Sequence, residues 1–466
     1  MPSSETEAIE RERICELNGA PERRGRYVLY WMQQSQRAQV NPALELAILA
    51  ANRLHLPVLV AFGLTDDFPG ANARHYAFML QGLTETAGRL RERGVAFTIR
   101  RGAPDAVILA LAPEAALIVC DHGYLRIQKE WRTRVAAGAG VRVVRVEGDL
   151  LVPRAAASGA RELGARTLRP KLARLRERYL RRPRSHRPQV SGATLAVASD
   201  LVLDDPRQVL DSLKVDRSVG PVESFTGGYS QARARLKAFV GGDLKQYVSA
   251  RACPGQARVS HLSAYLHFGQ ISPIEVALAV RDADAPEEAR TSFLEELLVR
   301  RELAANFVDT TPDYDRYESV PEWAQRSLAA HAKDPRPHRY DYDTLARAAT
   351  HDPYWNAAMR EMLTTGYMHN HMRMYWGKKV LEWSATPGAG YAHLLQLNNT
   401  YFLDGRDPSS FANVGWVFGL HDRPWPERPI FGTVRYMNAA GLERKTDIKV
   451  YTAKWGGEGG QGALAL

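Results

Sequence analysis

Cysteine is scarce in this sequence and long apolar runs are absent, and the two facts exclude several classes of protein. The 466 residues include Cys15, Cys120 and Cys253, whose odd number and wide spacing exclude a disulfide framework and a zinc-binding pattern. The N-terminus is polar and lacks the apolar segment of a signal peptide. No run of about twenty apolar residues is long enough to span a bilayer. We therefore expect a cytoplasmic protein, or a nuclear one in a eukaryotic host.

Acidic residues are outnumbered by basic ones. Lys and Arg total 62 against 52 Asp and Glu, which gives a net charge of +10 and an isoelectric point near 9.5. Such a balance favours polyanionic partners such as nucleic acid. Most of the basic residues are arginines, whose planar guanidinium suits phosphate contacts. A generic basic surface would give the same balance, so charge alone leaves both interpretations open.

Residues 26–153 alternate between strand-like and helix-like segments. This alternation predicts a doubly wound parallel sheet, a Rossmann-like α/β domain, preceded by an N-terminal tail over residues 1–25. No G-x-G-x-x-G follows the first strand, so a dinucleotide site of that type is not expected. We expect the strands at residues 26–32, 56–64, 95–102, 116–121 and 141–153.

The rest of the chain has a different pattern. Residues 154–220 form an interdomain connection, which contains the basic run RPKLARLRERYLRRPRSHRP at 169–188. This run is either a solvated charged face or a nucleic-acid contact. From residue 221 to 466 helical periodicity dominates, and six of the nine tryptophans fall between Trp323 and Trp425. We predict a second, all-α domain with an aromatic interior.

The stretch GYMHNHMRMYWGKKVLEW, residues 366–383, combines cationic side chains with spaced indoles. Arg373, Trp376 and Trp383 lie at intervals of three and seven residues, so on a helix they share one face. Trp355, in a preceding helical segment, could approach the same face. Tryptophans stepped in this way can relay electrons, although they can equally be large core residues.

Arg373 needs an anionic partner if it is buried, because an unpaired interior charge is unfavourable. The downstream segment LNNTYFLDGRDPSSF offers Asp404 and Asp407 on either side of a turn at Gly405. A salt bridge between Arg373 and Asp404 would frame a pocket between helix and loop. Asn398, just upstream, could present its amide to the ring nitrogen of a ligand.

These segments resemble a known family. GYMHNHMRMYWGKKVLEW, LNNTYFLDGRDPSSF, GTVRYMN and LSAYLHFGQIS are similar to motifs of the class II cyclobutane pyrimidine dimer (CPD) DNA photolyases, within the photolyase and cryptochrome superfamily. LYWMQQSQRAQVNPAL, ARTLRPKL and FLEELLVRRELAANF also match that class, and the resemblance runs from about residue 26 to residue 447.

The resemblance implies a fold, a cofactor and a reaction. An N-terminal α/β antenna domain would precede an all-helical catalytic domain that holds FAD. Reduced FAD, excited by blue or near-UV light, would pass an electron to a pyrimidine dimer flipped out of double-stranded DNA, and the cyclobutane ring would split. The protein would be a deoxyribodipyrimidine photo-lyase, acting as a monomer.

For the flavin site, the resemblance implies roles residue by residue. Trp376, Trp355 and Trp383 match an electron-transfer chain that begins beside the flavin. Asn398 matches the residue that faces flavin N5, and the pair Arg373–Asp404 matches a salt bridge beside the ring system, with Asp407 in the same turn. The residues that match the phosphate- and ribityl-binding region are Tyr247, Ser260, Leu262 and Ser263.

For the lesion site, Glu296 matches the acid that hydrogen-bonds the dimer. Met374 matches a residue lining the dimer pocket, and Trp416 matches its aromatic wall. The residues that match DNA-binding positions are Arg251, Arg423 and Arg435. Two departures from the family pattern affect DNA binding: Ala252 replaces a usual Asn, and the segment from Trp416 to His421 is one residue shorter.

The α/β domain could hold a second, light-harvesting chromophore, for which 8-hydroxydeazaflavin is the precedent that the resemblance supplies. Its expected contacts lie on βα loops and helix starts: Phe62, Arg74, His75, Tyr76 and Met79. Two rival functions remain open. One is a cryptochrome-like flavin light sensor, and the other is a flavin-free nucleic-acid-binding scaffold whose indoles only pack.

Overall fold

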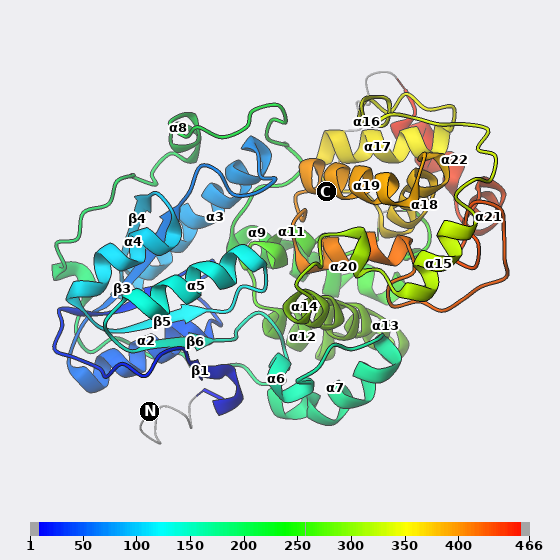
Figure 1. Cartoon of the computed structure of the whole chain (residues 1–466). Helices are drawn as coiled ribbons and strands as arrows, with labels where there is room; N and C mark the ends of the chain where they lie inside the picture. The colour runs from blue at the N-terminus through cyan, green and yellow to red at the C-terminus, as the bar shows by residue number, and fades with distance from the viewer. Residues whose placement is uncertain (1–8, 257, 458–466) are drawn as a thin grey trace.

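The computed structural model describes residues 9–256 and 258–457, which form an α/β region and a helical region side by side (Figure 1). The sheet has six strands in the order β1-β6-β5-β2-β3-β4, and every pairing except that of β1 with β6 is parallel. This confirms the predicted parallel sheet. The strands are β1 (Ile14–Glu16), β2 (Tyr27–Trp31), β3 (Val58–Leu64), β4 (Ala96–Arg101), β5 (Ala115–Asp121) and β6 (Val143–Val146).

The edge strand β1 departs from the sequence prediction. Its three residues lie within the segment predicted as a tail, yet Ile14 pairs with Val146 and Glu16 with Val144 in antiparallel register. A strand this short carries no readable alternation, and its pairing partner is distant in the sequence. The correction is that the α/β domain begins before residue 26.

Helices cover both faces of the sheet, and β2 shows why. Val28 and Tyr30 point into the apolar core beneath α2 (Pro42–Leu54) and α3 (Ala73–Glu92), whereas Leu29 points into the core beneath the other two helices. Successive strand residues face opposite sides, so a strand buried on both faces is apolar throughout. The opposite pair of helices is α4 (Pro104–Leu111) and α5 (Arg126–Gly138).

The connection between the two regions is mostly irregular and includes three short or medium helices. They are α6 (Arg154–Ala157), α7 (Ala165–Tyr179) and α8 (Pro206–Asp211). The helix α8 packs on α3 of the α/β domain, whereas α7 packs on the helical domain (Figure 1). The basic run of the sequence therefore begins in a regular helix.

The helical region contains one apolar core around α17 to α20 and a second around α9 to α14. A π-helical turn, η5 (Glu295–Arg300), joins α13 to α14. The helices are α9 (Tyr229–Gly241), α10 (Tyr247–Ala250), α11 (Ser263–His267), α12 (Pro273–Arg281), α13 (Glu287–Leu294), α14 (Arg301–Thr310), α15 (Glu322–Ala330), α16 (Tyr342–Ala346), α17 (Pro353–Thr365), α18 (Asn370–Trp383), α19 (Pro387–Tyr401), α20 (Pro408–Val417), α21 (Ala439–Lys445) and α22 (Ile448–Trp455). Over the described residues, none of the helices has the length and apolar character needed to cross a membrane.

The helical segment that carries Trp355 and the one that carries Trp376 and Trp383 are separate helices, α17 and α18. Gly366 ends α17 in the left-handed region, with φ of 70°, and its N–H donates to the carbonyl of Met362. Glycine adopts this conformation without steric penalty, which makes it a common helix terminator. The break lets α18 turn back and pack against α17, which brings indoles from both helices together.

Candidate active site

Three tryptophans from α17 and α18 form a continuous stack in the core of the helical domain. The rings of Trp355 and Trp376 are nearly parallel, with their centroids 6.3 Å apart. The ring centroids of Trp355 and Trp383 are 5.7 Å apart. The Trp355 indole N–H donates to the carbonyl of Trp376 at 3.0 Å. All three side chains are buried. Trp355 thus bridges the other two, as the expected order requires.

The stack continues in opposite directions from its two ends. At one end, Trp376 meets Phe402 edge-on with centroids 5.9 Å apart. At the other end, Trp383 contacts Tyr340 and the exposed His351, each with ring centroids 5.3 Å apart. The stack therefore connects the surface near His351 with the interior near Phe402.

Arg373 and Asp404 form the predicted salt bridge at the interior end. Two guanidinium nitrogens donate to the two carboxylate oxygens, each at 3.1 Å. The guanidinium also lies 3.8 Å from the ring centroid of Phe402, within cation–π distance. Phe402 therefore separates the salt bridge from Trp376, which places a fixed charge pair beside the inner end of the indole stack.

Asn398 and Asp407 lie on either side of Asp404 in the sequence but have different surroundings. Asn398 is buried near the end of α19, and its amide donates to the side-chain oxygen of Asn399. Asp407 caps α20 by accepting from the N–H of Ser409, and it contacts His267. Burial raises the pKa of Asp407, but the His267 hydrogen bond and charge outweigh that effect and lower the pKa to about 2.

The four residues expected at the phosphate and ribityl groups occupy two neighbouring segments. Tyr247 begins α10 and is buried against Phe239 and Phe293. Leu262 is the buried N-cap of α11, and Ser263 is the exposed first residue of that helix. Neither Ser263 nor Ser260 makes a side-chain hydrogen bond within the described part of the chain. Both hydroxyls can thus bind a ligand.

The polar groups in this region fit a bulky polar cofactor. Buried polar atoms are normally hydrogen-bonded, yet among the described residues Trp376 Nε1 and His369 Nε2 have no partner. Burial lowers the pKa of His369 to about 3, so its imidazole is neutral. Its Nδ1 accepts from the His371 N–H, so the proton lies on Nε2, which can donate a hydrogen bond. These groups, together with the two serine hydroxyls, supply donors and acceptors for a flavin dinucleotide.

Glu296 lies on the π-helical turn η5 in an ion pair that the sequence prediction did not foresee. Its carboxylate accepts from Arg251 Nη2 at 2.6 Å, and Arg251 also donates to the hydroxyl of Ser292. The side chains of Glu296 and Arg251 are 37% and 32% exposed, so solvent or a ligand can reach both. Two residues predicted to bind the lesion and the DNA backbone therefore contact each other.

A second cluster forms around Trp416, at the end of α20. The Arg435 guanidinium lies 5.6 Å from the Trp416 ring centroid and 4.1 Å from that of Trp425. Asp422 fixes this arginine by accepting from Nε at 2.8 Å and from Nη2 at 3.1 Å. Arg423 is exposed, and its guanidinium lies over Trp425. The indole of Trp416 itself is half-buried.

Sequence reasoning missed one member of this cluster, Lys378. Its ammonium is fully buried, donates to the Val417 carbonyl at 2.6 Å and lies 4.8 Å from the Trp416 ring centroid. Burial lowers the pKa of Lys378 to about 7. A lysine within an apolar helical pattern was the available signal. Met374, on the preceding turn of α18, is half-buried.

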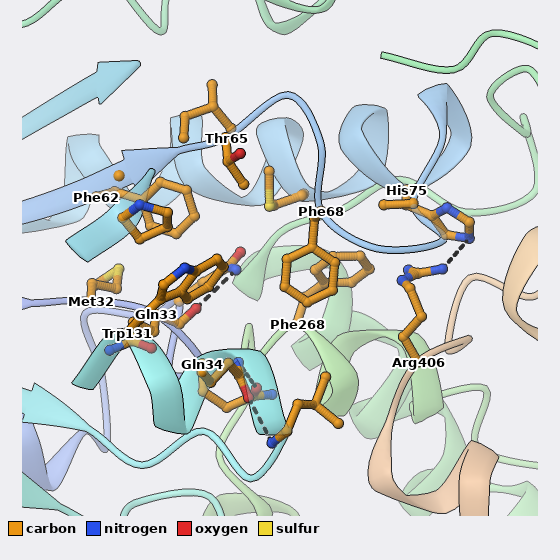
Figure 2. A pocket seen from close by; sticks show the side chains of 18 of the residues that line it. Met32, Gln33, Gln34, Phe62, Thr65, Phe68, His75, Trp131, Phe268 and Arg406 are labelled. Carbon is orange, nitrogen blue, oxygen red and sulfur yellow. Dashed lines mark hydrogen bonds between the residues drawn. The ribbon is translucent and has the colours of Figure 1, made fainter. Parts of the chain in front are cut away.

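A separate pocket lies where the α/β and helical domains meet (Figure 2). It opens beyond the carboxyl ends of β2 and β3, the usual ligand position in such folds, and its empty space is about 880 Å³ with the open solvent at its mouth included. Aromatic rings dominate its lining, with a group of glutamines at one side. The lining includes Trp31, Gln33, Gln34, Gln36, Phe62, Phe68, His75, Tyr76, Met79, Gln128, Trp131, Phe268 and Arg406.

Four of the five residues expected around an antenna line this pocket, and Arg74 does not. The Arg74 guanidinium instead donates to the carbonyls of Met362, Leu363 and Tyr401, which ties α3 to the helical domain. Its long side chain reaches past the pocket, a direction that sequence position alone does not give. His75 remains at the pocket wall, with Arg406 Nη1 3.0 Å from its Nε2 (Figure 2).

Comparison with known proteins identifies the family to which this architecture belongs. A family model described as DNA photolyase matches residues 28–190. The deoxyribodipyrimidine photo-lyase of Methanothermobacter thermautotrophicus is 46% identical over 447 residues, which cover 95% of this chain and 98% of that protein. The enzyme of that name from Potorous tridactylus is 37% identical and matches 91% of this chain and 80% of its own length.

The solved structures agree on the fold. A class III photolyase from Agrobacterium tumefaciens superposes with a TM-score of 0.72 over 94% of this chain and 88% of its own, at 20% identity. That identity supports the fold alone, whereas the identity to the Methanothermobacter and Potorous proteins over most of their length establishes kinship. The chain belongs to the DNA photolyase family.

Proposed function

We propose that this chain is a deoxyribodipyrimidine photo-lyase of the class II type, which uses light to split cyclobutane pyrimidine dimers in double-stranded DNA. The observation that carries the proposal is the buried stack Trp376–Trp355–Trp383, which runs from the surface to the Arg373–Asp404 salt bridge. The indole N–H of Trp376, at the inner end of the stack, is buried and has no partner among the described residues. Buried donors are normally hydrogen-bonded, so this N–H favours a bound ligand over a flavin-free scaffold. Because the proposed substrate is DNA, we expect the protein to act in the cytoplasm, or in the nucleus of a eukaryotic host, and to act as a monomer.

The helical domain would hold FAD through both polar and apolar side chains. The hydroxyls of Ser260 and Ser263 are suited to phosphate or ribityl oxygens, while Leu262 and Tyr247 supply apolar contacts. When bound, reduced FAD supplies the light-excited electron that splits the dimer. The Asn398 amide is suited to a ring nitrogen of the flavin. The Arg373–Asp404 pair beside Phe402 places a fixed dipole where charge on the ring system changes.

The indole stack would conduct an electron inward when the cofactor has become oxidised. Its members touch in the order Trp383, Trp355, Trp376, and all are shielded from water. His351 and Tyr340 at the outer end lie where a soluble reductant can reach. This stack restores the active state and is not needed for the repair step itself.

Glu296 and Arg251 would exchange partners when DNA binds. In the structure the carboxylate and the guanidinium satisfy each other at 2.6 Å. Arginine binds a phosphate in the same bidentate manner as a carboxylate, so Arg251 would be able to move to the DNA backbone and release Glu296. The freed Glu296 side chain would then be available to hydrogen-bond the dimer and to stabilise charge there.

Trp416 would form the opposite wall of the lesion pocket. Its ring is in contact with the cations of Lys378 and Arg435, which restrain the indole. Stacking on such a rigid aromatic surface favours an extruded base. Arg423, which is exposed on the same rim, would contact the DNA backbone and make binding salt-dependent.

The interdomain pocket would hold a planar antenna chromophore of the 8-hydroxydeazaflavin type. Its aromatic lining suits a flat ring system, and three buried polar side chains have atoms without partners among the described residues. They are Trp31, Gln33 and Gln36. Such groups at one edge of an apolar pocket fix the orientation of a ligand.

A repair assay tests the proposed function. The purified protein, reconstituted with FAD and reduced, is mixed with an oligonucleotide duplex that carries one dimer, and restored thymines are measured by chromatography. We expect repair under blue light and none in darkness. A protein that binds FAD but leaves the dimer intact under illumination would be a light sensor. A colourless protein after reconstitution would be the scaffold.

A further inference from the structure

The positive charge of this protein is concentrated in one short segment. Residues 165–187 contain ten Lys and Arg residues against a single acid, Glu177, which is a net charge of +9. The whole chain has a net charge of +10. The other residues are therefore almost neutral in sum, and a general basic surface does not account for the charge of the chain. The segment corresponds to α7 and the irregular stretch after it.

The helix α7 buries one face and turns its basic residues outward. Its apolar residues Leu168, Leu172 and Tyr179 are buried at helical spacing. Its basic residues cover the solvent side, where some are neutralised by salt bridges to Glu295, Glu162, Glu177 and Glu12. Within residues 9–256 and 258–457, the exposed arginines of the segment that form no salt bridge are Arg166, Arg174, Arg181, Arg182, Arg184 and Arg187.

The start of α7 touches both parts of the lesion site. Arg169 forms a two-pronged salt bridge with Glu295, at 3.0 and 2.7 Å, and Glu295 directly precedes Glu296 on η5. Gly164, the N-cap of α7, packs against the turn that leads to Arg423, since a Cβ built on it would lie 3.7 Å from the His421 carbonyl. The basic helix thus begins at the rim of the proposed pocket.

We propose that the exposed face of α7, with the basic stretch that follows it, binds the phosphate backbone of the DNA duplex on one side of the lesion. The inference rests on the proposed function, because the lesion site fixes where the duplex enters. Charge complementarity identifies the partner: a duplex carries one negative charge per about 1.7 Å of its axis, and the exposed arginines of a regular helix present matching cations. The contacts would be independent of base sequence.

The length of the helix sets the extent of this interface. Its 15 residues extend over about 22 Å at a rise of about 1.5 Å per residue. A duplex rises about 3.4 Å per base pair, so α7 can follow roughly six base pairs of a single arm. The interface is therefore one-sided, and the two DNA arms that flank a dimer should differ in their contribution to affinity.

A double variant, Arg166→Gln with Arg174→Gln, tests the proposal. Both side chains are exposed and outside the catalytic machinery. The matched control is Arg91→Gln with Arg207→Gln, which removes two exposed arginines from the α/β side of the chain at equal cost in net charge. Binding of a duplex with one dimer, and of the same duplex without it, is measured by fluorescence anisotropy over a series of KCl concentrations.

We expect the α7 variant to bind both duplexes several-fold more weakly than the native protein. The slope of log affinity against log salt should become shallower by about 0.9 for each phosphate that the variant no longer neutralises, or about 1.8 in all. The control variant should retain the native slope. Shortening one arm of the duplex by about six base pairs should abolish the difference between α7 variant and native protein, and shortening the other arm should preserve it.

Two results would overturn the inference: an unchanged salt slope in the α7 variant, or an equal change in the control variant. The second result would mean that only net charge matters. Repair of saturating DNA under light is measured in parallel, and the α7 variant should retain it. A native protein that binds DNA with the predicted slope yet repairs nothing would contradict the proposed function and leave the α7 interface in place.

Discussion

Glu296 and Glu302 lie six residues apart on the continuous helix formed by α13, η5 and α14, yet they occupy opposite environments. Glu296 faces the rim, where Arg251 pairs with it and solvent reaches it. Glu302 is buried and accepts from the backbone N–H groups of Leu151 and Val152. Burial raises the pKa of Glu302 to about 8. The same residue type thus serves as an exchangeable charge at the rim and as a neutral acid in the interior.

Trp376 and Trp416 also differ in their exposure, as the two glutamates do. Trp376 is buried between the Trp355 indole and Phe402, so its nearest aromatic neighbours are positioned for electron transfer. Trp416 is half-buried beside two cations, and the exposed part of its ring is available to a ligand. Position relative to the surface, more than residue type, separates the proposed electron-conducting interior from the proposed DNA-binding rim.

Replacing Trp376 by Phe should have the largest effect. The same change at Trp416 should have a different effect, which distinguishes the two indoles. We expect light-driven reduction of oxidised flavin to be lost, because the inner member of the stack is missing, while chemically pre-reduced enzyme still repairs dimers. Absorbance during illumination measures the reduction. The matched variant Trp416→Phe should reduce its flavin normally and bind lesions more weakly. Unchanged photoreduction in Trp376→Phe would remove this residue from the chain.

Replacing Glu302 by Gln sharpens the contrast between the two carboxyl groups. Native Glu302 keeps its proton until the pH approaches about 8, whereas the unfolded chain releases it near pH ~4.3. The folded state therefore binds the additional proton between these values, and its free energy of unfolding falls as the pH rises, by about 3 to 5 kcal/mol. Denaturant unfolding at several pH values measures this.

In Glu302→Gln that part of the pH dependence should disappear, because the amide oxygen accepts the same backbone hydrogen bonds without titrating. The flatter profile should make the variant at least as stable as the native protein at alkaline pH. An unaltered pH profile would show that Glu302 is ionised in the folded protein and that water reaches its carboxyl group in spite of its burial.

Replacing Glu296 by Ala should lower the yield of repair severalfold. Removing one preorganised donor from a dry active site costs about 10²- to 10³-fold in kcat, and the effect should be smaller here because the Glu296 side chain is partly exposed. FAD content should not change, which its absorption spectrum checks. The control is Glu295→Ala on the same π-helical turn, where the carboxylate binds Arg169 and Arg300 instead. Full quantum yield in Glu296→Ala would exclude a hydrogen bond from this side chain to the dimer as a contribution to repair.

Replacing Lys378 by Met should have the smallest effect, because it removes a cation behind Trp416 and leaves the ring in place. Cation–π pairs contribute about 1 kcal/mol, so lesion affinity should fall a few-fold. In the native protein, affinity should fall as the pH rises through about 7, where the buried ammonium loses its proton. A titration of binding against pH should be flatter in Lys378→Met, and an equal slope in both proteins would exclude the lysine.

Much of the fold could be predicted because it depends on local pattern. The strand β5 is apolar along nearly its whole length and is buried on both faces, and the helices on the sheet have apolar stripes at helical spacing. The edge strand β1 could not be predicted, since three residues carry no periodicity. The helix break at Gly366 was visible as a residue type, but its consequence depends on the packing of α18 against α17.

The candidate site also contains some contacts that the sequence predicts and others that it does not. Arg373 and Asp404 could be paired from sequence, because a buried arginine requires an acid and a turn offered one. The pair Glu296–Arg251, the lysine beneath Trp416 and the reach of Arg74 across the domain boundary could not. Each depends on the direction of a long side chain, and that direction is set by the elements packed around it.

Local sequence sets which segments are helical or extended, which residue types gather in the later half of the chain, and where the positive charge lies. These are properties of neighbours along the chain, and periodicity and composition record them. Folding in three dimensions sets which carboxyl group is shielded from water, which indole is accessible to a ligand, and that the basic helix begins next to Glu295 and Glu296. Those properties depend on exclusion of water and on contacts between distant segments, which no local pattern encodes.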